Sequence, residues 1–430
     1  MRKTAIVTGF ILAGMLLAPE ASHAETLQDA LTAAWLNNPS LEARRDELDI
    51  ADERIEQARA QRRPTVNLFG GYQYESIDSN RPIAFNLGDR PVASAQIEAR
   101  LPVYTGGRLN AGIRQAEAGS RVAEAQLDSA GQGLLLDTVT AYVDILRDRQ
   151  VIDIRKNSIG LLEGQFTAAS DRFEVGDITR TDVALARARL EGGTAQLAAA
   201  QAQLEASLAI YALITGLEAG DLAPVPPLPD VPASFDDALE VALSGNPDIE
   251  AALQAESAAR EGVALAEGAL KPEVSLIGQA GIQEYHVDGF RDTSVVAGAE
   301  ARVPLFTGGL NTSRVREARL ARNQARSQID LNRRIVRTNV ARAWYGLEAA
   351  TQSVSASERQ VEAAELAFEG AREELSVGTR TTLDVLDQEQ QLLEARLALA
   401  TSRRDRYVAA HQLLAAMGQL TPDRLGMGMR

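Results

Sequence analysis

Four segments of the chain alternate apolar and polar side chains with a period of two, which predicts β-strands. These segments cover about 65–76, 92–102, 273–285 and 294–304. Valine, leucine, isoleucine, alanine, glycine and tyrosine dominate one face, and glutamine, serine, glutamate and arginine dominate the other. Strands of about ten residues with one apolar face suit a barrel through an outer membrane. A sheet with one wet face gives the same alternation, so the strands alone leave both alternatives open.

Long stretches rich in alanine and leucine lie between and after the strands and predict helices. One very long helix follows each Gly-Gly pair, at roughly 109–173 and 311–375. After a glycine-containing break, another helix completes two helical hairpins at about 107–216 and 309–418. A helix of about 65 residues is about 100 Å long. A rod of that length must lie against other helices in an extended assembly.

The chain contains two copies of one plan. Pro39 and Pro64 have counterparts at Pro247 and Pro272, both at an offset of 208 positions (247 − 39 and 272 − 64). The Pro-x-x-Thr-Gly-Gly joint that begins at Pro102 recurs at Pro304, an offset of 202 (304 − 102). Because the offset changes between Pro64 and Pro102, the length difference lies in one loop.

The repeats define the domain organisation. The first covers 25–216 and the second covers 234–418, with a tail at 419–430. The proline-rich segment 217–233 between them predicts a stiff, extended linker.

The first residues predict a secretory signal peptide over 1–24. Arg2 and Lys3 precede an apolar run, and Ser22 and Ala24 are the small residues expected before a cleavage site. The run is shorter than the about 20 residues needed to span a bilayer. No later run of that length is free of charge, so we expect no transmembrane helix in the mature chain.

Composition excludes several classes of function. The net charge of −15 argues against nucleic acid as a partner. The chain has 0 cysteines, and its 3 histidines show no metal-ligand spacing. No nucleophile elbow, phosphate loop or dinucleotide motif is present. We therefore expect neither an enzyme nor a metal or cofactor site.

Four strands are too few to close a barrel, which needs about eight. Open sheet edges are not tolerated in lipid, so a membrane barrel requires several copies of the chain. Two copies give eight strands and three give twelve, and the arithmetic does not choose between them. Turn-rich segments at 77–91 and 286–293 are the expected outer loops.

The turns between the helices carry a resemblance to a known family. Residues 376–387, Ser-Val-Gly-Thr-Arg-Thr-Thr-Leu-Asp-Val-Leu-Asp, resemble the second inter-helix turn of the TolC family, and residues 173–183 resemble the first. The two Pro-x-x-Thr-Gly-Gly joints resemble that family's strand-to-helix transitions. The resemblance implies an α+β membrane protein, a trimeric 12-stranded outer-membrane β-barrel continued by a long α-helical periplasmic barrel. The linker 217–233 would belong to its equatorial region.

The resemblance also implies a function and partners. A homotrimer in outer-membrane lipid would be the exit duct of a tripartite export system. It would work with a periplasmic adaptor (membrane fusion protein) and an inner-membrane pump of the ABC or RND type. The cargo would be proteins, as in type I secretion, or drugs and other small molecules. The alternative is a periplasmic coiled-coil scaffold or adaptor protein without a membrane barrel.

Two groups of residues match the family's gate. Asp384 and Asp387 share a helix face and match its acidic constriction. Arg380 matches an arginine that ties the tip shut, and Thr181 and Asp182 match its partners. An ordinary solvated helix face would also account for the acids, and a helix-start charge for the arginine.

Further residues extend this interpretation. Leu375 replaces a tyrosine of the family's link set, and Arg180 offers an alternative link beside Asp182. Glycine-containing turns match the adaptor contacts, although turn chemistry alone also explains glycine. The expected docking tips are Val175, Gly176, Val377 and Gly378. Four charged residues that recur at the 202 offset on the polar strand faces are expected in the barrel lumen, namely Glu98, Arg100, Glu300 and Arg302.

Overall fold

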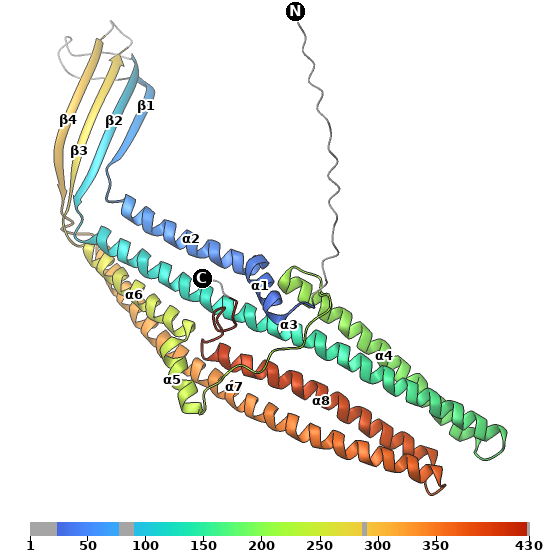
Figure 1. Cartoon of the computed structure of the whole chain (residues 1–430). Coiled ribbons are helices and arrows are strands. Elements are labelled where there is room, and N and C mark those ends of the chain that lie inside the picture. The colour runs from blue at the N-terminus through green and yellow to red at the C-terminus, as the bar shows by residue number, and fades with distance from the viewer. Residues whose placement is uncertain (1–23, 77–89, 286–289, 428–430) are drawn as a thin grey trace, which may run out of the picture.

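The chain is an elongated, bent molecule with a sheet at one end and two hairpin tips at the other (Figure 1). This computed structural model describes residues 24–76, 90–285 and 290–427. All of the expected signal peptide except its last residue lies outside the described residues. Most of the expected outer loops lie outside them as well.

Four antiparallel strands form one sheet in chain order. They are β1 (Thr65–Glu75), β2 (Arg90–Tyr104), β3 (Glu273–Tyr285) and β4 (Phe290–Arg302). The last strand begins four residues before the expected 294. The reason is that Phe290 pairs directly with Tyr285, so the ladder continues to the end of β3.

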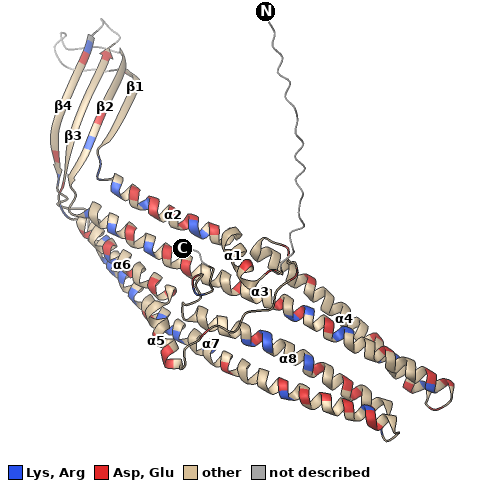
Figure 2. Ribbon diagram, viewed as in Figure 1, with Lys and Arg blue, Asp and Glu red and all other residues tan. Residues whose placement is uncertain are grey.

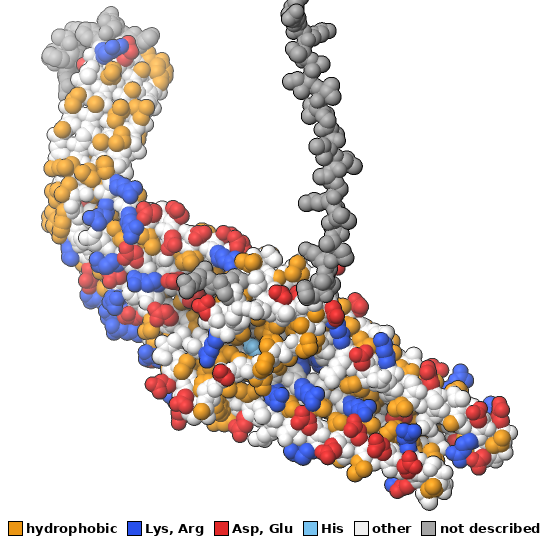
Figure 3. All heavy atoms as spheres, in the orientation of Figure 1, with side chains coloured by type: hydrophobic (Ala, Val, Ile, Leu, Met, Phe, Trp, Pro, Cys, Tyr) orange, Lys and Arg blue, Asp and Glu red, His pale blue; other side chains and the backbone are white. Residues whose placement is uncertain are grey.

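The register confirms the alternation of faces. Leu68 lies opposite Ile97, and Ala280 lies opposite Val295, so these apolar residues share a face. Leu68 is 74% exposed and Val295 is 78% exposed. Figure 3 shows apolar side chains along the sheet, and Figure 2 shows few charges there. The sheet therefore presents an uncovered apolar surface, and β1 and β4 are its two edges.

Eight helices are described, and each element of the first repeat has a counterpart in the second. They are α1 (Leu27–Asn37), α2 (Pro39–Ala60), α3 (Arg108–Glu174), α4 (Arg180–Thr215), α5 (Phe235–Gly245), α6 (Pro247–Gly268), α7 (Leu310–Ser376) and α8 (Thr382–Ala416). The first helical position of α2 and α6 is a proline preceded by an asparagine cap. The helices α3 and α7 each have 67 residues, which gives rods of about 100 Å.

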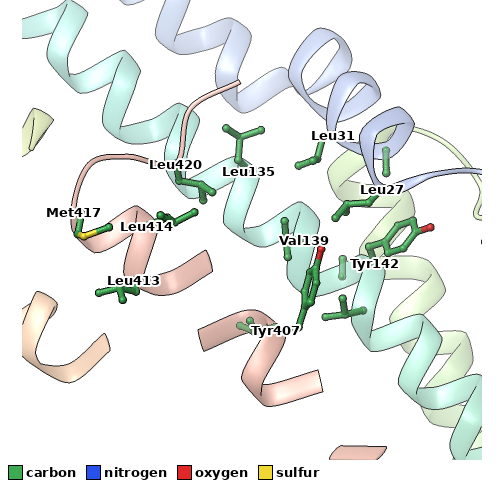
Figure 4. Packing of buried hydrophobic residues seen from close by; sticks show 14 of the residues in the cluster. Leu27, Leu31, Leu135, Val139, Tyr142, Tyr407, Leu413, Leu414, Met417 and Leu420 are labelled. Carbon is green, nitrogen blue, oxygen red and sulfur yellow. The ribbon is translucent and has the colours of Figure 1, made fainter. Parts of the chain in front are cut away.

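Helix packing places the hairpin α3–α4 beside the hairpin α7–α8. The helix α3 contacts α4 and α8, and α6 packs on both α3 and α7. The main apolar core lies at the waist, where the N-terminal helix, α3 and the end of α8 meet (Figure 4). There the Tyr142 hydroxyl donates to the carbonyls of Glu25 (2.9 Å) and Ala223 (2.6 Å). These bonds fix Glu25 and the linker on α3.

Among the described helices, α4 alone is long and apolar enough to cross a membrane by length and composition. We expected no such helix. Its C-terminal part, 193–215, contains a single charged residue, Glu205. Since α4 packs along α3 and α1 in the helical part of the molecule, its apolar character suits helix packing. Most of its apolar window is uncovered in the single chain.

Candidate functional site at the hairpin tips

The tip of the first hairpin is a tight turn closed by backbone hydrogen bonds. Gly176 has φ +80°, in the left-handed region. Its N–H donates to the Phe173 carbonyl (2.9 Å), and the Asp177 N–H donates to the Arg172 carbonyl (2.9 Å). These two bonds form a Schellman motif, which ends α3 and satisfies its last carbonyls.

The tip of the second hairpin repeats this geometry. Gly378 has φ +78°. Its N–H donates to the Leu375 carbonyl (3.0 Å), and the Thr379 N–H donates to the Glu374 carbonyl (2.9 Å). The preceding valines, Val175 and Val377, point outward and are 80% and 73% exposed. Each expected docking tip is therefore an exposed apolar side chain beside a glycine.

A capping box begins the returning helix on both sides. The Thr179 N–H donates to Asp182 Oδ2 (2.9 Å), and the Thr381 N–H donates to Asp384 Oδ2 (3.0 Å). These backbone and hydroxyl donors hold the pKa of both Asp182 and Asp384 below the ordinary range. Asp384, an expected constriction residue, is thus an ionised cap of its own helix.

Asp387 joins the two hairpins. Its Oδ1 lies 3.0 Å from Nη2 of Arg189 on α4. Arg189 was not predicted as a site residue, because nothing near it in the sequence indicates that α4 and α8 meet at this height. Both side chains are partly exposed, so the pair is accessible to water.

The expected gate residues are not all brought together. Nε of Arg380 lies 2.5 Å from Oε2 of Glu374 in its own hairpin. No described contact within the chain joins Arg380 to Thr181 or Asp182. The link of Arg380 to Thr181 and Asp182 of a neighbouring hairpin stays a prediction, and so does the role of Arg180. Leu375, which replaces the family tyrosine, packs against a small apolar cluster of α7 and α8 near the tip.

The four charged strand residues form one cluster on the sheet. Arg100 Nη2 lies 3.2 Å from Glu300 Oε2. Glu300 also pairs with Arg302 (3.2 Å), and Arg100 lies 3.9 Å from Glu98. Charges on the polar face are thus compensated locally. In the described part of the chain, no three acidic, histidine or cysteine side chains are grouped to hold a metal ion.

A second residue that the sequence did not predict is Glu389 of α8. It is 3% exposed, unlike most glutamates. Ser158 Oγ donates to its Oε1 (3.2 Å) across the contact with α3. Burial raises the pKa of this carboxyl to about 7. The sequence pattern of α8 did not indicate that Glu389 is buried, since its neighbours Gln388 and Gln390 are also polar.

Comparison with known proteins agrees with this architecture. The family described as outer membrane efflux protein matches residues 30–216 and 238–419, once in each repeat. The chain is 32% identical to the outer membrane efflux protein BepC of Brucella suis, over 99% of this chain and 92% of that protein. It is 28% identical to the outer membrane protein TolC of Vibrio cholerae, over 96% of this chain and 95% of that protein.

The fold is that of solved outer-membrane channels. The Campylobacter jejuni CmeC outer membrane channel superposes with a TM-score of 0.80 at 15% identity, covering 97% of this chain and 94% of that one. The family match covers most of both repeats, and the relatives align along nearly their whole length. The chain therefore belongs to the outer membrane efflux protein family, and it is an exit duct of the outer membrane that extends into the periplasm.

Proposed function

We propose that three copies of this chain assemble into a homotrimer, with a barrel of twelve strands and a tunnel of long helices. The observation that carries the proposal is the four-stranded sheet, which has two free edges and an exposed apolar face. Lipid tolerates no open edges, so neighbouring copies must pair β1 with β4. The uncovered side of α4, where Leu213 is 78% exposed, would pack against the next copy. Glu98, Arg100, Glu300 and Arg302 would then face the lumen.

The helical tips would form the periplasmic entrance. The exposed Val175 and Val377, with the glycines beside them, would dock a periplasmic adaptor. Asp384 and Asp387 would place six carboxylates around the tunnel axis and make the entrance cation-selective. Arg380 would tie the tip shut through Thr181 and Asp182 of another copy, with Arg180 as a further link.

The duct would continue the path of an inner-membrane ABC or RND-type pump through that adaptor. The pump selects the cargo, so proteins, drugs and other small molecules all fit the same tunnel. Transport through such a duct requires no covalent chemistry, and we propose no enzymatic activity for the chain.

Conductance in planar bilayers tests this function, together with the mass of the same purified sample in detergent. Cation-selective pores from a protein of three chains are the expected result. A monomeric protein that gives no pores would contradict the proposal and would favour a periplasmic scaffold without a barrel.

A further inference from the structure

A partly open cavity lies between the two hairpins in their tip-side half. It has a volume of about 180 Å³ and is lined by residues of α3, α4 and α8. Glu389 of α8 is part of its wall and is 3% exposed in the single chain. Assembly with further copies cannot increase that exposure, so the burial of Glu389 does not depend on the oligomeric state.

Only one of the two carboxyl oxygens of Glu389 has a hydrogen-bond partner. Its Oε1 accepts a hydrogen bond from Ser158 of α3, at 3.2 Å. Its buried Oε2 has no hydrogen-bond partner. A buried carboxylate with one hydrogen bond is unfavourable, whereas a neutral carboxyl fits this environment.

The charged groups around Glu389 are engaged elsewhere. Arg155 of α3 donates to Gln196 of α4 (2.5 Å), and its own buried Nε has no partner. Arg189 of α4 pairs with Asp387.

A second, smaller cavity also borders Glu389 and is lined in part by Arg396 of α8. Arg396 pairs with Glu365 of α7 at 2.8 Å. No described cation lies within ion-pair distance of Glu389. The carboxyl therefore lacks the compensating charge that would keep it ionised in a buried position.

The first hairpin has no acid at the equivalent position. At the 202 offset, the counterpart of Glu389 is Arg187, whose side chain is 70% exposed and lies near Glu191 in its own helix. An acid buried at this position is thus not part of the repeated plan of the hairpins. Among the described residues, the other buried acid is Asp148 of α3, and it pairs with Arg147 and accepts a hydrogen bond from Ser207. Glu389 lacks such a cation and lies where α8 meets α3, a contact that joins one hairpin to the other.

We propose that Glu389 is a proton-operated latch between the two hairpins of the tip. When the carboxyl is neutral, α8 stays packed on α3 and the tip is closed. When it ionises, the separated arrangement is favoured, because water can then reach the carboxylate. This proposal rests on the proposed function of the tip as the tunnel entrance.

The direction of the pH dependence follows from the burial. The pKa of Glu389 is raised from 4.5 to about 7. A raised pKa means that the packed state binds the proton more tightly than the separated state. The contact between α3 and α8 around Glu389 therefore contributes its full stability at pH values below 4.5, the ordinary pKa of a glutamate. This contribution is lost as the pH rises through about 7.

Other titrating groups act in different places or ranges. The pKa values of Asp182 and Asp384 are held below 3.8, so these residues stay ionised throughout the neutral range. His411 is buried in the waist core and has its pKa lowered by burial. A pH step near 7 at the tip can thus be assigned to Glu389 by substitution.

Single-channel conductance between about pH 5.5 and about pH 8.5, a range that brackets the expected midpoint, tests the latch. Wild-type conductance should rise with pH, with a midpoint near 7. Glu389→Gln, which is neutral at every pH, should stay at the low-pH conductance and lose the step. Glu394→Gln removes an exposed acid of the same helix and should keep it. Ser158→Ala removes a hydrogen bond that favours the ionised form, so it should move the midpoint to higher pH.

A step that persists in Glu389→Gln would overturn the latch, and so would a conductance that falls as the pH rises. Hydrogen exchange of α8 amides near Glu389 gives a second measurement that needs no pore. Protection should fall near pH 7 in the wild type, beyond the intrinsic pH dependence of exchange, and should not fall there in Glu389→Gln. A wild type without pores but with this loss of protection would contradict the proposed function and retain the latch.

Discussion

The turn at Gly176 and the turn at Gly378 are built alike. Both glycines have φ near +80°, both close a Schellman motif, and both are followed by a threonine cap with an aspartate three residues later. The likeness ends within two turns of helix. Where α8 has Asp387 and Glu389, α4 has Leu185 and Arg187 at the 202 offset.

This difference separates two kinds of requirement. The shared residues are those that the backbone needs, since a left-handed position and an N-cap tolerate few residue types. The residues that differ carry charge into the contact between the hairpins. The repeat thus preserves the scaffold, and the acidic chemistry of the tip belongs to the second hairpin.

The largest effect is expected when the acids of the second hairpin are removed from the constriction. Asp384→Asn combined with Asp387→Asn removes six carboxylates from a trimer. The ratio of K⁺ to Cl⁻ permeability should then fall by about tenfold, because the local cation concentration depends on that charge. The reversal potential in a KCl gradient measures the ratio.

The first hairpin supplies the matched control for that experiment. Asp182→Asn changes the equivalent cap of α4, and no second acid follows it there. It should leave the permeability ratio close to that of the wild type. An equal loss of selectivity in both variants would mean that the two hairpins contribute alike to the constriction.

A smaller effect tests the likeness of the two turns. Gly176→Ala and Gly378→Ala should each destabilise the hairpin by about 1 kcal/mol, since an L-residue is disfavoured at positive φ. A methyl group would meet no atom within 4 Å at either glycine, so crowding adds nothing. The midpoint of thermal loss of the helical circular dichroism signal measures this.

Gly370 is the control for the glycine pair. It lies inside α7, and an added methyl group there also meets nothing within 4 Å. Gly370→Ala should stabilise the helix by about 0.5–1 kcal/mol. Clearly unequal losses at Gly176 and Gly378 would show that one turn is held by contacts beyond its own backbone.

The difference between local backbone requirements and contacts between the hairpins also explains what the sequence could predict. The four strands, the hairpins and the repeat follow from local signals, namely the alternation of residues and the positions of glycine and proline. The position of Arg100 and Glu300 on the polar faces of their strands followed from the alternation, whereas their ion pair depends on how the strands pair. The contacts that join the hairpins could not be predicted in this way. The pairing of Asp387 with Arg189 and the burial of Glu389 depend on how rods far apart in sequence lie against each other.

The smallest expected effect concerns that pairing. Arg189 and Asp387 are both partly exposed, and water and salt screen such pairs. A double-mutant cycle with Arg189→Gln and Asp387→Asn should give a coupling energy of about 0.2–1 kcal/mol, measured by thermal unfolding and smaller at high salt. Arg187→Gln, which removes an exposed cation two positions away, should show no coupling to Asp387. A salt-independent coupling well above that range would mean that this pair, and not the protonation of Glu389, is the main tie between the hairpins.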